Sequence, residues 1–302
     1  MLRSTLLYLS EKRSIQRFIM GHDFSRKSAQ RFVAGETRDD AIAAARALNE
    51  KGIEATMDHL GENVSQESEA RAALEEYLAL ADAIHSSGVR SHISIKLTAL
   101  GLDIGLPLCE DHVGKICQRA QEIGSFVRID MEGSKYTDIT IDLYKKVLAR
   151  YGNVGLAIQA YLYRTEKDVE ALLALGGKFR LCKGAYKEPA EVAYQAKSDV
   201  DASYVRLMKR MMSSGLFHGI ATHDESIIRI AQQYAREQKL PREAYEFQML
   251  HGIRRELQLE LARDHGMRVY IPYGTNWYPY LMRRLAERPA NLWFILSNFL
   301  KS

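Results

Sequence analysis

The sequence has few cysteines and lacks the motifs that usually mark a cofactor loop or a catalytic nucleophile. Its three cysteines, Cys109, Cys117 and Cys182, form no CxxC pair, which argues against a disulfide framework or structural zinc and fits a reducing compartment. No GxGxxG, GxxxxGKS or GxxxxGKT, HExxH or GxSxG motif occurs. A Gly-rich dinucleotide site, a P-loop, a zinc-hydrolase site and serine acyl transfer therefore lack their signatures, and we expect no metal.

Long apolar runs and blocks of like charge are also missing. No segment approaches the roughly 18 apolar residues of a membrane span, and the apolar N-terminal stretch breaks at residues 10–12, too early for a signal peptide. The net charge of +4 arises from 42 basic and 38 acidic residues spread along the chain, without a nucleic-acid footprint. We expect a soluble, cytoplasmic protein with no nucleic-acid partner.

What is present is a repeated alternation of β-rich and amphipathic helical stretches. It predicts βα units, and eight strands are the number in a (β/α)8 TIM-like barrel of the α/β class. We assign the catalytic barrel to residues 51–302 and extra helices, packed on it, to residues 1–50. A doubly wound open sheet is the alternative, but it would favour fewer units and a Gly-rich loop. The expected strands are residues 53–61, 91–101, 126–133, 155–162, 178–186, 219–224, 245–250 and 268–274.

Polar side chains occupy one face of several expected strands. Because side chains alternate along a strand, Lys96, Asp130, Gln159 and Arg180 lie opposite the apolar face that must pack against helices. They therefore point into the barrel, where an unpaired charge costs several kcal/mol. Each falls toward the C-terminal end of its strand, where such barrels carry their sites, so together they predict a site.

A purely structural use of these charges is the alternative. Buried ion-pair networks occur in proteins that use them only to fill space. Here the same strand faces would allow Lys96 to pair with Asp130, or Arg128 with Glu132. Branched aliphatic side chains would fill a structural barrel at less cost, which favours the site.

The segment after the eighth strand presents two adjacent arginines on one helix face. Tyr280, Arg283 and Arg284 are spaced at i, i+3 and i+4, so a phenol and two guanidinium groups project together. Paired guanidinium groups suit a small carboxylate, because each can donate two parallel hydrogen bonds. The alternative is a solvated face on which Arg283 pairs with Glu287.

The segment RLCKGAYKEP at 180–189 leads from the fifth strand into a loop containing Gly184. Glycine and exposed amides at a barrel rim can let an anionic ligand approach closely. An ordinary βα loop is the alternative. His223, in ATHD at 221–224, is suited equally to a ligand contact or a structural role.

Nine short stretches, in a fixed order, resemble one enzyme family. They are FVAGET (32–37), DHLGE (58–62), SIKLTALG (94–101), RIDME (128–132), IQAYL (158–162), RLCKGAY (180–186), ATHD (221–224), YEFQMLHGIR (245–254) and VYIPYG with WYPYLMRRLAERPAN (269–291). The ordered set, rather than any one string, resembles the monofunctional bacterial proline dehydrogenases. Those enzymes are FAD-dependent (β/α)8-barrel flavoproteins.

The resemblance implies roles for the polar residues. Lys96, Arg283 and Arg284 would bind the proline carboxylate, and Asp130 would be the acidic catalytic residue beside Lys96 and the ring nitrogen. Arg180 would be catalytic through a hydrogen bond near flavin N5. Tyr270 and Tyr280 would line the substrate ring, with Tyr270 associated with preference for proline over hydroxyproline. Glu62 would close the site by pairing with Arg283. The implied FAD contacts are Met131, Gln159, Arg180, Lys183, Gly184, Ala185, Thr222 and His223.

The resemblance also implies a reaction. L-Proline would lose hydride from C5 to flavin N5 and become Δ1-pyrroline-5-carboxylate, the first step of proline catabolism to glutamate. A quinone or another acceptor would reoxidise the flavin, with a functional link to pyrroline-5-carboxylate dehydrogenase and at most peripheral membrane contact. Cys182 stands where a branched aliphatic is expected and is small and apolar enough to fit.

Two other functions are compatible with the residues alone. One is a Schiff-base lyase or aldolase with Lys96 as the amine nucleophile. The other is a barrel without activity that serves as a binding or assembly partner. The charged set argues against the second, because those residues cost stability without an evident structural use.

Overall fold

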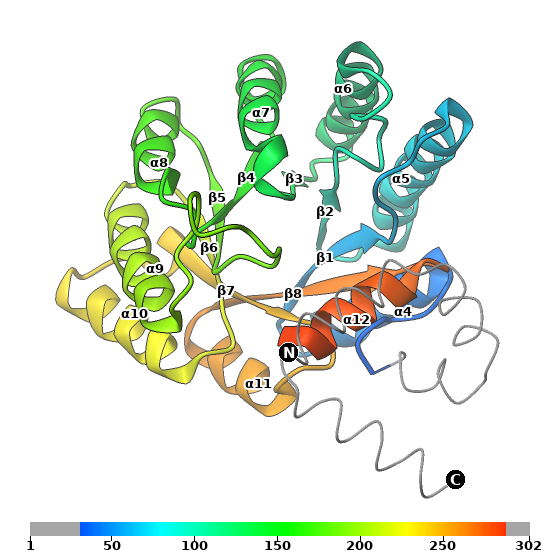
Figure 1. Cartoon of the computed structure of the whole chain (residues 1–302). Coiled ribbons are helices and arrows are strands. Elements are labelled where there is room, and N and C mark those ends of the chain that lie inside the picture. The colour runs from blue at the N-terminus through cyan, green and yellow to red at the C-terminus, as the bar shows by residue number, and fades with distance from the viewer. Residues whose placement is uncertain (1–30, 288–302) are drawn as a thin grey trace, which may run out of the picture.

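Eight parallel strands close into a barrel in sequence order, which confirms the predicted fold class (Figure 1). The fold is that of a computed structural model, which describes residues 31–287 and, of these, the side chains up to residue 282. The strands are β1 (Glu54–His59), β2 (Ser91–Ile95), β3 (Val127–Ile129), β4 (Val154–Gln159), β5 (Phe179–Cys182), β6 (His218–Ala221), β7 (Tyr245–Leu250) and β8 (Gly266–Tyr273). The closing pair, β8 and β1, aligns Glu54 with Arg268 and His59 with Tyr273.

Helices surround the barrel as an outer ring. They are α4 (Arg38–Asn49), α5 (Glu67–Ser87), α6 (Leu106–Glu122), α7 (Thr137–Tyr151), α8 (Thr165–Leu173), α9 (Lys197–Met212), α10 (Glu225–Glu237), α11 (Arg255–Asp264) and α12 (Trp277–Glu287), with 3-10 turns η1 (Ser134–Tyr136) and η2 (Arg242–Ala244). Helix α5 ends at Gly88, whose φ of 67° lies in the left-handed region that glycine adopts without strain. Among the described helices, none is both long and apolar enough to cross a membrane.

Six of the strands are shorter than the sequence predicted, most clearly β2 and β3, whereas β7 has the predicted bounds and β8 is slightly longer. The expected strand over 91–101 ends at Ile95, and that over 126–133 ends at Ile129. Lys96 and Asp130 each follow directly after the last strand residue, so they lie just beyond the strand ends. At these positions the chain leaves the sheet and begins the loops that surround the barrel mouth.

The described part of the N-terminal segment covers the seam of the barrel. Thr37 and Asp40 form a capping box that begins α4, because each side chain accepts from the other residue's backbone N–H. Helix α4 packs on β8, β1 and α5, and Ala34 donates a backbone hydrogen bond to Pro272 at the end of β8. Residues 1–30 of the predicted helical segment lie outside the described residues.

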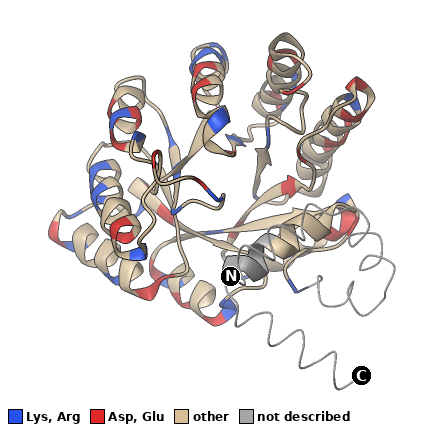
Figure 2. Cartoon of the chain, viewed as in Figure 1, with Lys and Arg blue, Asp and Glu red and all other residues tan. Residues whose placement is uncertain are grey.

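The interior of the barrel is polar in two separate layers. Charged residues lie on the central strands as well as on the outer helices (Figure 2). We call the layer near the strand starts the lower layer and define it by Glu54, Arg128, Glu246 and Arg268. The upper layer, near the strand ends, is defined by Asp58, Lys96, Asp130, Arg180 and Tyr270. The helix-facing sides of the strands carry the apolar core, with residues such as Ile93, Ile129 and Leu181 fully buried.

Candidate active site

A cavity of about 770 Å³ opens above the upper layer. This volume lies within the range of small-molecule and cofactor sites. The predicted site residues that line the cavity are Lys96, Asp130, Met131, Gln159, Arg180, Lys183, Gly184, Ala185, Thr222, His223, Tyr270 and Tyr280. Side chains from β4, β5, β8 and α12, and from the segments that directly follow β2, β3, β5 and β6, therefore line one cavity.

Lys96 is held by Asp58 from the neighbouring strand. Its Nζ lies 2.5 Å from Asp58 Oδ2, and Tyr77 donates to Asp58 Oδ1 at 3.3 Å. Burial tends to lower the pKa of Lys96, but the carboxylates of Asp58 and Asp130 outweigh it and raise the pKa. Lys96 is thus a charged ammonium at the cavity wall, which suits the binding of an anion better than a Schiff-base role, where the amine must be neutral.

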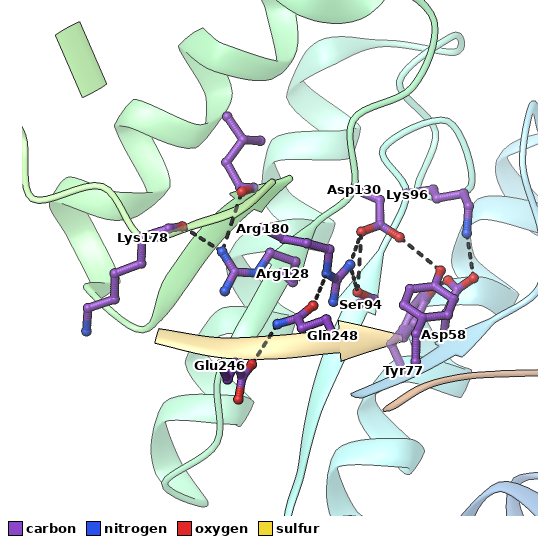
Figure 3. A network of polar contacts seen from close by, with 12 residues as sticks. Asp58, Tyr77, Ser94, Lys96, Arg128, Asp130, Lys178, Arg180, Glu246 and Gln248 are labelled. Atoms are coloured by element: carbon purple, nitrogen blue, oxygen red, sulfur yellow. Dashed lines mark hydrogen bonds and ion pairs between the residues drawn. The ribbon is translucent and has the colours of Figure 1, made fainter. Parts of the chain in front are cut away.

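Arg180 and Asp130 form the second buried ion pair, and Tyr270 completes it. Arg180 Nη1 lies 2.5 Å from Asp130 Oδ1 and 3.0 Å from Ser94 Oγ (Figure 3). Tyr270 donates to Asp130 Oδ2 at 2.9 Å. Burial raises the pKa of Tyr270 well above its usual value, so the phenol stays protonated and remains a donor. The guanidinium also lies 5.2 Å from the Tyr270 ring centre.

The two ion pairs of the structural alternative are wrong. Lys96 pairs with Asp58 rather than Asp130, because Asp130 is occupied by Arg180. Arg128 and Glu132 lie at opposite ends of their segment. Arg128 donates to the carbonyl of Lys178 at 2.6 Å, in the lower layer. Glu132 accepts from Thr98 at the barrel mouth.

The loop after β5 forms the wall beside Gln159. Gly184 has φ 124°, and a Cβ there would lie 2.4 Å from the Tyr161 ring, so only glycine lets this backbone pack so closely. The Ala185 N–H donates to Gln159 Oε1 at 3.4 Å, and Gln159 Nε2 donates to the Glu132 carbonyl at 2.9 Å. The backbone at Gly184 and Ala185 is therefore held along the cavity wall, while the implied contacts of residues 183–185 with FAD stay predictions.

Lys183 lies in a charged cluster at the cavity rim. Its Nζ contacts Asp201 at 2.5 Å and Asp224 at 3.0 Å, and Lys197 pairs with both carboxylates. Burial opposes ionisation of Asp224, but hydrogen bonds from Ser226 and Lys183 outweigh it and lower its pKa. His223 Nε2 accepts from the Leu250 N–H at 3.0 Å, which assigns the ring proton to Nδ1.

Three predicted residues are not placed at the cavity wall. Glu62 is half-buried near the mouth, close enough to Lys96 to raise the pKa of its ammonium, but it does not line the cavity. Arg283 and Arg284 follow Tyr280 on α12, but their side chains lie outside the described residues. Their roles stay predictions.

Sequence reasoning missed Asp58, Gln248 and Arg254. Asp58 shares the inward face of β1 with Glu54 and Thr56, so the alternation rule could have found it. Gln248 is inward by the same rule on β7. Arg254 gave no such signal, because it lies in a loop with φ 54° and reaches the cavity rim through a bond to the His223 carbonyl.

The donor set of the cavity fits a flavin dinucleotide. Arg180 and the Gln159 amide provide polar contacts of the kind a flavin ring edge needs, and Lys183, Lys197 and Arg254 provide cations for a diphosphate. Gly184 and Ala185 also line the cavity beside these donors. Within residues 31–287, no three or more His, Cys, Asp or Glu are grouped to hold a metal ion.

Comparison with known proteins gives matches along nearly the whole chain. Residues 41–296 match the family model described as proline dehydrogenase. The chain is 41% identical over 302 residues to proline dehydrogenase 1 of Bacillus subtilis strain 168, covering 100% of both chains. It is 38% identical over 283 residues to proline dehydrogenase of Deinococcus radiodurans, covering 90% of each.

A solved structure is similar as well. Proline utilization A (PutA) from Bdellovibrio bacteriovorus, inactivated by N-propargylglycine, shares 25% identity with a TM-score of 0.81. The match covers 86% of this chain and 32% of the PutA chain, so this chain spans about a third of that protein's length.

Proposed function

The chain belongs to the proline dehydrogenase family of oxidoreductases, and we propose that it oxidises L-proline to Δ1-pyrroline-5-carboxylate, the first step of proline catabolism to glutamate. The family is flavin-dependent in general, and the proposed cofactor is FAD. The observation that carries the proposal is the upper layer itself. A charged Lys96 and the Arg180–Asp130–Tyr270 group face one cavity from separate strands.

Binding of the substrate carboxylate is assigned to Lys96, Arg283 and Arg284. Asp58 keeps Lys96 charged and fixes its Nζ, while the remaining ammonium hydrogens can turn to the ligand. Three cations around one carboxylate fix the orientation of the proline ring, so that C5 is presented in a single direction. Tyr270 and Tyr280 line the ring on the cavity wall.

The amine of proline must be neutral before the C5–H bond breaks, because its lone pair forms the C=N bond as hydride leaves. The surrounding cations disfavour the ammonium form, and Asp130 is assigned to influence removal of the amine proton. Arg180 and Tyr270 hold the two Asp130 oxygens in place. When bound, FAD would supply N5 as the hydride acceptor, held by Met131, Gln159, Arg180, Lys183, Gly184, Ala185, Thr222 and His223.

Glu62 is assigned to closing the site over bound substrate by pairing with Arg283. A quinone or another carrier accepts the electrons, and pyrroline-5-carboxylate dehydrogenase is the enzyme functionally linked to the product. The protein is assigned to the cytoplasm, with membrane contact that is peripheral at most. Residues 1–50 are assigned as a helical segment packed on the catalytic barrel of residues 51–302.

The test is a visible spectrum of the purified protein before and after anaerobic addition of L-proline. The proposal expects flavin bands that bleach with proline. A colourless protein trapped by borohydride with a carbonyl substrate would instead indicate Schiff-base chemistry at Lys96. A bound flavin that proline does not bleach would indicate a barrel without this activity.

A further inference from the structure

The guanidinium of Arg180 donates hydrogen bonds through two of its three nitrogens. On one side Nη1 binds Asp130 and Ser94. On the other side Nε donates to Gln248 Oε1 at 2.6 Å (Figure 3). Arg180 and Gln248 are only 5% and 3% exposed, so neither bond competes with bulk water. Contacts on both Nε and Nη1 fix the plane of the group and therefore the direction of Nη2.

The orientation of the Gln248 amide is itself determined. Its Nε2 donates to Glu246 Oε1 at 2.6 Å, and the same carboxylate oxygen accepts from Arg268 Nε at 2.7 Å. An ionised carboxylate only accepts, so Gln248 must present its NH₂ group to Glu246 and its carbonyl to Arg180. Glu246 in the lower layer thereby sets the direction of a hydrogen bond in the upper layer.

The neighbouring strand β6 leaves room for this arrangement. Gly219 on β6 lies beneath the amide, and a Cβ there would lie 2.3 Å from Gln248 Nε2. Any larger residue at position 219 would displace the amide from its line between Glu246 and Arg180. Gln248 is also part of the cavity wall, so its displacement would move a group that contacts the site directly.

We propose that Gln248, oriented by Glu246, is a positioning residue that fixes the rotation of the Arg180 guanidinium in the cavity. The proposal rests on the proposed function in one respect, namely that Arg180 faces the flavin. Loss of Gln248 would leave Arg180 hydrogen-bonded through Nη1 and packed on the Tyr270 ring, without the Nε contact that fixes the rotation of its guanidinium. A misplacement of about 1 Å in a group at the reacting centre can cost about hundredfold in rate.

The first variant is Gln248→Met, which keeps the volume and removes the acceptor. We expect kcat with proline to fall about tenfold to hundredfold. KM should change by less than about twofold, because the carboxylate ligands are intact. The flavin midpoint potential, measured by dye equilibration without proline, should become more negative, because a cation is no longer fixed beside the reduced ring. Gly219→Ala should shift kcat and potential in the same direction.

Exchanging the side chains at 246 and 248 tests whether the direction of the hydrogen bonds matters, rather than the volume of the side chains. Gln248→Glu alone places two carboxylates in contact, and their repulsion should move the acceptor away from Arg180 and lower kcat. That loss should lessen as pH falls, because one proton shared between the two carboxylates restores the missing donor. Glu246→Gln combined with Gln248→Glu restores the pattern. The new amide at 246 accepts from Arg268 and donates to the new carboxylate at 248, which accepts from Arg180. We expect this pair to regain kcat to within about threefold of wild type, which packing alone would not produce.

Asn153→Leu is the matched control. It removes an amide that donates to the carbonyls of Cys117 and Ser125, away from the cavity, so stability should fall while kcat and potential stay unchanged. An unchanged kcat and potential in Gln248→Met would overturn the proposal, as would a folded exchange pair no better than Gln248→Glu. If proline does not reduce the wild type, the proposed function fails. The potential of FAD-loaded Gln248→Met then still tests the position of Arg180.

Discussion

The upper and lower layers of the barrel interior are both charged, yet they differ in what their charges face. In the lower layer Arg268 is enclosed by Glu246, Glu54 and the Ala55 carbonyl, and Arg128 by the carbonyls of Lys178 and Leu156. The ion pairs of the upper layer lie against a cavity. Buried charge alone therefore does not distinguish the two layers, whereas the cavity beside the upper layer does.

The electrostatics of the layers differ as well. Burial lowers the pKa of Arg128 to about 9, and the nearby Arg180 adds to the effect. Burial acts the same way on Arg268, but Glu246 and Glu54 outweigh it and raise the pKa. In the upper layer, burial raises the pKa of Asp58 although Lys96 opposes this. Each layer balances its own charge, and Gln248 is the bridge between them.

The largest effect should come from Arg180→Ala in the upper layer. It removes the cation beside Asp130 and the implied flavin edge, so kcat should fall about 10²- to 10³-fold while the fold remains intact. Stopped-flow reduction by proline measures the loss of activity, and circular dichroism checks that the fold is intact. Arg210→Ala, which breaks a surface pair with Glu170, is the control and should leave turnover unchanged. Wild-type turnover in Arg180→Ala would remove the functional distinction between the layers.

Replacing both Arg283 and Arg284 with alanine should act on substrate affinity. Loss of two charge-assisted partners for the carboxylate should raise KM for proline by about tenfold to hundredfold and spare FAD binding. Steady-state kinetics and FAD fluorescence titration separate these effects. Lys145→Ala with Lys146→Ala removes two surface cations from α7 and controls for net charge. An unchanged KM would show that the carboxylate binds elsewhere.

Gly155→Ala should affect the lower layer alone. A Cβ there would lie 2.3 Å from Arg128 Nη1 and 2.6 Å from the Lys178 carbonyl, so the fold should lose about 2–3 kcal/mol. Urea unfolding measures the loss, and kcat of the folded protein should be unchanged. Gly105→Ala, where a Cβ meets only Pro107 at 4.0 Å, is the control. A loss of kcat without a loss of stability would contradict the separation of the layers.

The smallest effect concerns pH and His218, at the lower end of β6. Burial lowers the pKa of His218 to about 3, and its ring accepts from the Phe179 N–H. Between pH 6.5 and about 3 the unfolded chain binds the extra proton, so stability present above pH 6.5 is lost on acidification. His218→Gln should reduce this slope by at most about 1.4 kcal/mol per pH unit.

Urea unfolding at several pH values measures that slope. His85→Gln, on the exposed side of α5, is the matched histidine control. Identical slopes in wild type and His218→Gln would show that His218 is not the titrating group.

The sequence predicts which residues face the cavity better than it predicts their partners. Alternation along the strands was enough to bring Lys96, Asp130, Gln159 and Arg180 to one space. Partner choice depends on the stagger of the closed barrel. Asp58 aligns with Ser94 on β2, so Lys96, two residues further on, contacts Asp58 diagonally across the two strands. The spacing of residues along the chain does not reveal that Asp130 pairs with Arg180 rather than with Lys96. Strand ends were missed for the same reason, since the chain leaves the sheet where loops form the mouth.

Helix α4 has a consequence for the opposite end of the chain. By covering β8 and β1 it takes the position in the outer ring that the helix following the eighth strand would otherwise fill. Helix α12, the last helix among the described residues, does not have to support this part of the barrel wall and can place Tyr280 at the cavity. Helix α4 thus covers the barrel seam, which leaves α12 free to line the cavity. Deleting α4 should therefore loosen the closure of the barrel between β8 and β1 before it alters the position of Tyr280 on α12.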